Sequence, residues 1–512
     1  MNKRIIDKIF FLICFCLIFL NIPKLIQINI IGGLLGSKLI FYPLFIGFVY
    51  TIYCQYKYKD VFLCFYEFKK YIFIFCSITL LSTIVGLFIY PYYDIVLNGP
   101  VNQIEKMPIV LSVLNNMGIY IAEKYLVILW MIIRIIKTIF LDTFYTFGGA
   151  YMIYCWYYNR PKEGIRILLK AIVISVIIIL IYSVIDVFYL LGNNMATNIL
   201  IVVNPFLHEI VTSHGWWPPL LWKNQLRSIF TEPSYFGIYA AFVIPFLWYK
   251  FIRAQNIKYK ISFLVILTMF VFFLFLTRSR TAVALFMGEC FILIIYIFYL
   301  KNIIFIKNGV LILIFSIISF ISANILISNI TITNTNKMNI STYLDDNLGS
   351  LASTDKRSNA ARYSIIIAKL KIYKDYPLLG VGTNLINGYI PDYLPIMSEN
   401  NKEINMWIND QRKQGILKSG YPNLCEYASQ LAQNGSVGLI VFLLPAFILL
   451  KNLIKKIKER RIYYEQSLIY IVFSISLIGV LTSGLGDSIN ITYCYWVLLG
   501  LGYALCFGES SK

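Results

Sequence analysis

Long apolar runs alternate with short polar connections along nearly the whole chain. Each run has about 20 residues, the length that an α-helix needs to cross roughly 30 Å of hydrocarbon. The runs predict twelve transmembrane helices, whereas a transmembrane β-barrel would show short segments of alternating polarity. These helices are expected at residues 8–30, 32–54, 70–90, 138–157, 167–190, 233–250, 262–277, 281–300, 308–328, 425–450, 467–484 and 489–508. The fold class is therefore predicted to be an all-α polytopic membrane protein.

One further apolar stretch, residues 110–137, is interrupted by Arg134 and Lys137. A helix with charges on one side and apolar residues on the other lies in the membrane interface rather than across it. We therefore expect an interfacial or re-entrant amphipathic helix in this stretch.

Basic residues are concentrated in alternate loops, such as "NRPKEGIR", "KFIRAQNIKYK" and "KNLIKKIKERR". Because Lys and Arg are enriched in cytoplasmic loops, this pattern predicts that both termini are cytoplasmic. The short loop "TRSR" at 277–280 breaks the pattern, since it is basic and falls on the outer side. An exception of this kind favours a functional role for its arginines.

The chain divides by these criteria into four parts: residues 1–190, 191–328, 329–424 and 425–512. The first, second and fourth contain membrane helices, and residues 329–424 form a large extracytoplasmic loop. A helix is predicted at 359–375 within the loop, because apolar positions recur at helical spacing. Its stripe contains Tyr363, Ile366, Ile367, Leu370 and Tyr373, and Arg362 and Lys369 line the edge. The helix is expected to end at "DYPLLGVG", where proline and glycines act as breakers.

The composition excludes several classes of function. With 59% hydrophobic and 14% charged residues, the 512-residue chain does not resemble a soluble globule, which carries about a quarter charged residues. The net charge of +20 lies mostly in the loops, so it sets orientation and does not indicate nucleic-acid binding. Only two histidines are present, His208 and His214, and neither has a neighbouring histidine to complete a metal site. No metal or cofactor is predicted.

Four segments on the predicted outer side carry candidate chemistry: "RSIFTEPSYFG", "TRSRTA", "ARYSIIIAKLKIYKDYPLLGVGTN" and "NLCEYASQLAQNGSVGLI". They place arginines from distant parts of the chain on one membrane face. Arginine suits phosphate because its planar guanidinium donates two parallel hydrogen bonds and keeps its charge. The arginines are Arg227, Arg278, Arg280 and Arg362. This set favours a lipid-linked pyrophosphate as the substrate.

The same segments resemble the O-antigen polymerase and ligase superfamily, the Wzy polymerases and WaaL ligases. The shared features are an arginine before a Pro-Ser helix start, a Ser-Arg-Thr-Ala helix start, an arginine-led helix ending in "PLLGVG", and a Gly-x-x-Gly pair in a later helix. The resemblance covers about residues 225–445.

The resemblance implies a metal-independent glycosyltransferase at the outer face of the cytoplasmic (inner) membrane. Its substrate would be an undecaprenyl-pyrophosphate-linked oligosaccharide, held in contact with membrane lipid. Arg227, Arg280 and Arg362 match the catalytic arginines of the family. A carboxylate at the outer mouth of an apolar helix is rare without a role, so Glu232 and Glu426 are candidates for the general base. The expected substrate-binding residues are Arg278, Ser279, Lys369 and Tyr235.

Three functions remain open at this stage. The ligases place a histidine eleven positions before the Gly-x-x-Gly pair, and Leu424 stands there in this chain. This departure favours a polymerase that transfers glycan en bloc with inversion, for O-antigen, capsule or exopolysaccharide, with a chain-length regulator and a flippase as candidate partners. A ligase-type transferase and a polysaccharide flippase or transporter are the alternatives.

Structural readings also compete with the functional ones. Arg227 could anchor its helix at the headgroups, and Glu232 could pair with Arg227 or cap the helix that follows. Arg362 could belong to a solvated helix face.

Overall fold

The computed structural model describes residues 2–23, 27, 36–58, 66–100, 107–208, 225–330, 357–460 and 464–508. These residues form helices and connecting loops without a strand, and eight helices are long and apolar enough to cross a membrane. The all-α polytopic fold predicted from the sequence is confirmed. The eight are α4 (Tyr66–Ile89), α9 (Pro161–Leu190), α11 (Pro233–Arg253), α12 (Ile257–Leu276), α13 (Arg280–Leu300), α14 (Ile303–Ile330), α19 (Glu426–Glu459) and α20 (Tyr464–Ser483).

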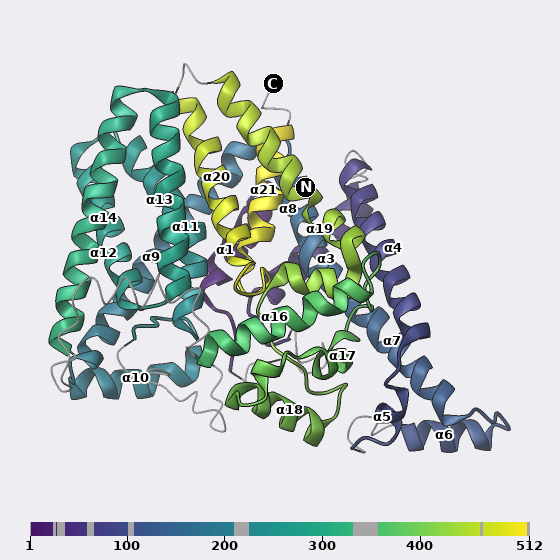
Figure 1. The fold of residues 1–512 in the computed structure, drawn as a ribbon. Coiled ribbons are helices and arrows are strands. Elements are labelled where there is room, and N and C mark those ends of the chain that lie inside the picture. Colours follow the sequence, from purple (N-terminus) through teal and green to yellow (C-terminus); the bar gives the residue numbers. More distant parts are fainter. Residues whose placement is uncertain are drawn as a thin grey trace.

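Helix α11 occupies the centre of the bundle and is buried along most of its length. An apolar helix with no polar face is typical of such a position. It packs against α12, α13 and α20 (Figure 1). Gly237 allows a close contact with α13, because a Cβ at this position would lie 2.5 Å from the Cβ of Ala282. The first turns of α11 and α13 therefore lie side by side.

The first predicted span, residues 8–30, is shorter in the structure. Helix α1 (Lys3–Phe15) continues only through a 3₁₀ turn, Cys16–Ile18. The chain then becomes extended at Phe19, four residues before Pro23. The last predicted span, 489–508, likewise contracts to α21 (Cys494–Phe507).

The stretch predicted as an interfacial helix contains two helices, α6 (Met107–Asn116) and α7 (Glu123–Thr143). Helix α7 runs without interruption through a π-helical turn, Phe144–Gly148, into α8 (Gly149–Tyr157). The helix predicted to start at 138 thus begins at Glu123. Its Arg134 guanidinium lies over the ring of Trp130 at 5.3 Å, which accommodates the charge within an otherwise apolar stretch.

The helix predicted at 359–375 is present as α16 (Arg357–Asp375) and lies across one end of the bundle (Figure 1). Two shorter helices of the same loop, α17 (Ile386–Tyr393) and α18 (Lys402–Gln414), pack against it. The prediction of a stripe along α16 is wrong about the buried face. The buried residues are Asn359, Ala361, Ser364, Ile365, Ala368, Lys369 and Ile372, whereas Leu370 is 43% exposed. Helix α16 packs against α19 and α17, and these contacts decide which face is covered.

The turn after α16 is anchored to a break in α19. Gly380 and Gly382 have φ of +66° and +94°, as expected for the predicted breaker residues. The backbone N–H groups of Val381 and Gly382 each donate to α19 carbonyls, those of Ala432 and Gln433, at 2.9 Å. Both carbonyls lie just before Gly435, where α19 departs from helical geometry. The turn therefore fixes α16 above the first part of α19.

Candidate substrate site at one end of the helix bundle

Four segments distant in sequence meet at the end of the bundle that α16 covers. They are the start of α11, α16 itself, the start of α19, and the loop between α20 and α21 (Figure 1). The backbone N–H of Glu426 donates to the carbonyl oxygens of Gly484 and Asp487 at 2.9 and 3.3 Å. These bonds hold the α20–α21 loop against the first turn of α19.

Arg362 extends from α16 toward this loop and is half-buried. Its Nη1 donates a hydrogen bond of 2.7 Å to the carbonyl oxygen of Gly486. It also interacts electrostatically with Glu232, Asp487 and Tyr235. Arg362 is therefore directed into a polar cluster and is not part of a solvated helix face.

Glu232 and Asp487 are the two carboxylates of this cluster. Burial raises the pKa of Asp487 to about 7, against the opposing effects of the Ser488 N–H and Arg362, and the charge of Glu232 raises it further. Burial also raises the pKa of Glu232, and Arg362 opposes this shift. Glu232 occupies the N-cap position of α11 but makes no side-chain cap, and its carboxylate accepts a bond of 3.3 Å from Ser234. Among the described residues, each of these carboxylates accepts one hydrogen bond, from Ser234 for Glu232 and from the Ser488 N–H for Asp487.

Lys369 and Glu426 form a second, more enclosed network, in which each is 3% exposed. Lys369 Nζ donates to Ser429 Oγ at 2.7 Å, and Asn423 Oδ1 lies 3.5 Å away. Burial lowers the pKa of Lys369 to about 8, and the nearby Glu426 opposes the shift. Glu426 itself accepts hydrogen bonds from Asn423, Gln430 and Ser488 at 2.7–3.1 Å. With three donors, Glu426 is less available as a proton acceptor than Glu232 or Asp487.

Arg227 lies in a separate polar cluster and is 3% exposed. It interacts electrostatically with Asp186 near the end of α9, and not with Glu232 as the sequence alternative proposed. Asp186 Oδ2 accepts the backbone N–H of Ser228 at 2.8 Å, and Ser228 has a φ of +56°. Arg227 Nε and Nη2 and Asp186 Oδ1 are buried and have no hydrogen-bond partner among the described residues. Unpaired buried polar atoms of this kind call for a functional explanation.

His208 belongs to the same cluster. It is 3% exposed, and within the described part of the chain its Nε2 has no hydrogen-bond partner. Burial lowers the pKa of His208 to about 3, and the charge of Arg227 acts in the same direction. The imidazole is therefore neutral at physiological pH. His214 lies outside the described residues.

The "TRSR" segment places its side chains at the start of α13. Arg278 has a φ of +50°, a conformation that is uncommon for residues other than glycine. Ser279 caps the helix, since its hydroxyl accepts the N–H of Ala282 at 3.4 Å. Arg280 is the first residue of α13, whose first turn lies beside that of α11. A bond of 3.1 Å from Leu226 N–H to the carbonyl oxygen of Leu276 joins the Arg227 segment to the end of α12.

The structure thus gathers some of the predicted residues and separates others. Arg362, Glu232 and Tyr235 share one cluster, and Lys369 and Glu426 share the adjoining network. Arg227 interacts with Asp186 instead, although its segment adjoins the same ends of α11 and α12. Sequence reasoning missed Asp186 and Asp487. Each of them is a carboxylate within or between apolar runs of the sequence. Burying a charged carboxylate there costs free energy unless it is paired, so such a position indicates a partner or a function.

Within the described ranges, no group of three or more His, Cys, Asp or Glu side chains could hold a metal ion. The features above define a polytopic helical membrane protein with arginine, lysine and carboxylate side chains gathered at one end of its bundle.

Residues 264–443 match the family model described as O-antigen ligase. This match supports the O-antigen polymerase and ligase superfamily, which the sequence motifs also indicated. The matched region contains six of the predicted site residues, namely Arg278, Ser279, Arg280, Arg362, Lys369 and Glu426. Arg227, Glu232 and Tyr235 precede it. No curated protein matches the sequence.

Proposed function

We propose that this protein is a polymerase of lipid-linked oligosaccharide repeat units at the outer face of the cytoplasmic membrane. The family match supports a glycan-processing enzyme, and the polymerase assignment is our inference beyond it. The observation that carries the proposal is Arg362, a cation of the matched region that is held beside two carboxylates of raised pKa. A phosphate-binding cation next to proton acceptors is the combination that glycosyl transfer from a pyrophosphate requires.

In the proposed reaction a sugar hydroxyl of one repeat unit attacks the anomeric carbon of a glycan on undecaprenyl pyrophosphate. The new glycosidic bond forms as the bond from the anomeric carbon to the pyrophosphate oxygen breaks, with inversion at that carbon. The electron pair of the broken bond stays on the pyrophosphate, where the arginines stabilise it. Stabilisation of charge that develops on a leaving group is usually the largest single catalytic contribution.

The proton of the attacking hydroxyl passes to a carboxylate. Glu232 and Asp487 are better suited than Glu426, because Glu426 already accepts three hydrogen bonds. A general base works best with a pKa near the working pH, and the pKa of Asp487 is raised to about 7. We assign the general base to one of these two carboxylates, Glu232 or Asp487, with Arg362 between it and the phosphates of the substrate.

The position of the ligase histidine favours a polymerase over a ligase. Leu424 stands there and packs against an apolar cluster of the outer loop. Its neighbour Asn423 bonds to Glu426, so the polar groups at this place serve the Lys369 network. A ligase remains the second candidate because the matched family model is described as one.

The decisive experiment uses purified full-length protein and a synthetic polyprenyl-pyrophosphate repeat unit, without added metal. The wild type should form oligomers. Arg362→Ala should lower the rate by at least about 100-fold, the usual effect of removing a group that stabilises the leaving charge. Arg412→Ala is the matched control, since Arg412 is an exposed arginine on α18 of the same loop. Equal oligomer formation by the wild type and Arg362→Ala would refute the proposal.

A deletion strain separates the three functions. A missing polymerase leaves single repeat units at the outer face, and a missing ligase leaves chains of normal length on the carrier lipid. Lipid-linked units that accumulate inside the cell would instead support the transporter alternative.

A further inference from the structure

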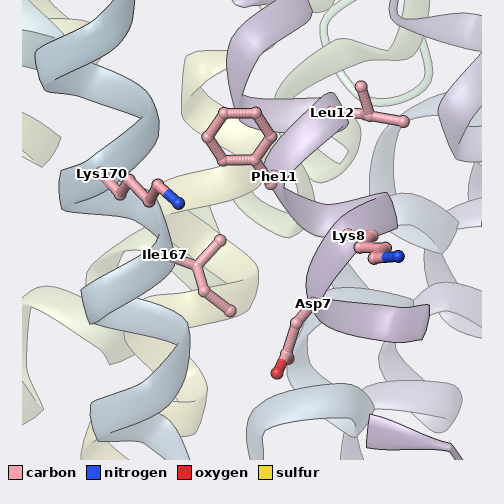
Figure 2. Close-up of a pocket in the computed structure, with 6 residues that line it drawn as sticks. All are labelled: Asp7, Lys8, Phe11, Leu12, Ile167 and Lys170. Carbon is pink, nitrogen blue, oxygen red and sulfur yellow. The ribbon is translucent and has the colours of Figure 1, made fainter. Parts of the chain in front are cut away.

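A groove lies between α1 and α9, near the start of α9 and therefore at the end of that helix opposite Asp186. Its volume is about 440 Å³. Its lining combines apolar side chains with charged ones: Asp7, Lys8, Phe11, Leu12, Ile167 and Lys170. Figure 2 shows Lys170 extending from α9 toward α1 in the space between Phe11 and Ile167.

The acidic residue of the groove is already paired. Asp7 forms an ion pair of 2.8 Å with Arg160 and also accepts a hydrogen bond of 3.1 Å from the Tyr157 hydroxyl. Lys170 lies 5.8 Å from the centre of the Phe11 ring. Neither Lys170 nor Lys8 has a carboxylate within ion-pair distance in the described part of the chain. Within the described residues, the two lysines of the groove therefore have no carboxylate partner of their own, since Asp7 is paired with Arg160.

The expected position of Lys170 in the membrane indicates which anion could pair with it. Lys170 lies nine residues after Pro161, about 14 Å along α9 at 1.5 Å per residue. Because the predicted membrane span begins at residue 167, we expect Lys170 at the level where headgroups meet acyl chains, on the side that the positive-inside pattern predicts to be cytoplasmic. A lysine at this level extends its amine toward the lipid phosphates.

We propose that this groove binds an anionic phospholipid of the cytoplasmic leaflet. The phosphate accepts from Lys170 and Lys8, and the first part of an acyl chain lies along Phe11, Leu12 and Ile167. Basic pockets between membrane helices on the cytoplasmic side are suited to such headgroups. The site is independent of the proposed glycan transfer, because it lies at the other end of α9.

The test is native mass spectrometry of the purified full-length protein titrated with phosphatidylglycerol or phosphatidylcholine. The wild type should bind phosphatidylglycerol more tightly than phosphatidylcholine. The double variant Lys8→Gln, Lys170→Gln should bind phosphatidylglycerol about 30-fold more weakly, at about fivefold per lysine. The control pair Lys162→Gln, Lys307→Gln removes two exposed lysines of α9 and α14 and should keep the wild-type affinity.

The pair Lys8→Arg, Lys170→Arg should also retain binding, which separates loss of charge from loss of folding. Unchanged phosphatidylglycerol affinity in Lys8→Gln, Lys170→Gln would overturn the proposal, as would equal binding of the two lipids by the wild type. Displacement of the lipid by millimolar inorganic phosphate would also overturn it, because the site would then recognise a free anion.

Discussion

Replacement of Gly435 by alanine tests whether the turn after α16 positions the candidate site. Gly435 has a φ of +66° and a ψ of −168°, a combination that is essentially restricted to glycine. A Cβ at this position would lie 2.1 Å from the carbonyl oxygen of Leu378 and 2.5 Å from the nitrogen of Leu379. Because both are backbone atoms, the turn itself would have to move.

The cost can be worked out from these contacts. The backbone conformation alone disfavours alanine by ~1–3 kcal/mol. Displacing the turn breaks the bonds from Val381 and Gly382 to the α19 carbonyls, each worth ~1 kcal/mol. Together these effects should lower the free energy of unfolding by about 3–5 kcal/mol. The turn also holds the end of α16, and a misplacement of about 1 Å in a catalytic group can cost a factor of about 100 in rate.

Two measurements on purified protein check this prediction: thermal unfolding, and oligomer formation from a synthetic lipid-linked repeat unit. Gly435→Ala should melt at a lower temperature than the wild type and lose most of its activity. Gly288→Ala is the control, since Gly288 lies within α13 and a Cβ there would meet no atom within 4 Å. The reasoning is wrong if Gly435→Ala melts and reacts like Gly288→Ala.

Three further predictions concern the charged networks. Because burial raises the pKa of Asp487 to about 7 and Asp487 accepts a proton only when ionised, the reaction rate should rise between pH 6 and 8. Asp487→Asn should flatten this rise. An unaltered pH profile in that variant would exclude Asp487 as the general base. Lys369→Met leaves Glu426 buried without its cation and should destabilise the protein by ~3–5 kcal/mol; adding Glu426→Gln should recover part of the loss in a thermal melt, and no recovery would contradict the coupling. Arg227→Ala should leave Asp186 buried without its cation, so adding Asp186→Asn should partly restore the melting temperature of the Arg227→Ala variant. Strictly additive losses in the double variant would show that the two residues do not interact.

The membrane helices in the middle of the chain could be predicted closely from the sequence. The spans predicted at 233–250 and 281–300 correspond to α11 and α13, which begin at Pro233 and Arg280. Their starts carry local signals, since proline suits the first helical position and Ser279 supplies an N-cap. Helix starts of this kind can be predicted because they depend on a few adjacent residues.

The errors arose where contacts from distant residues decide the outcome. The sequence predicts Lys369 at the edge of the apolar stripe of α16, but α19 presents Ser429 and Glu426 to it and it is buried. Asp487 was one polar residue in a short loop, and its position beside Arg362 depends on how the α20–α21 loop bonds to Glu426. Helical periodicity contains no information about these pairings.

The arrangement of charges in the candidate site combines cations with acids. The two adjoining networks contain two cations, Arg362 and Lys369, and three carboxylates, Glu232, Asp487 and Glu426. In the structure, Arg362 interacts with the two carboxylates whose pKa is raised, Glu232 and Asp487. A diphosphate that approaches Arg362 competes with them, and its negative charge favours protonation of Glu232 and Asp487 further. Departure of the pyrophosphate has the opposite effect. In the proposed reaction, therefore, the same guanidinium that binds the leaving group also sets the basicity of the group that takes the proton.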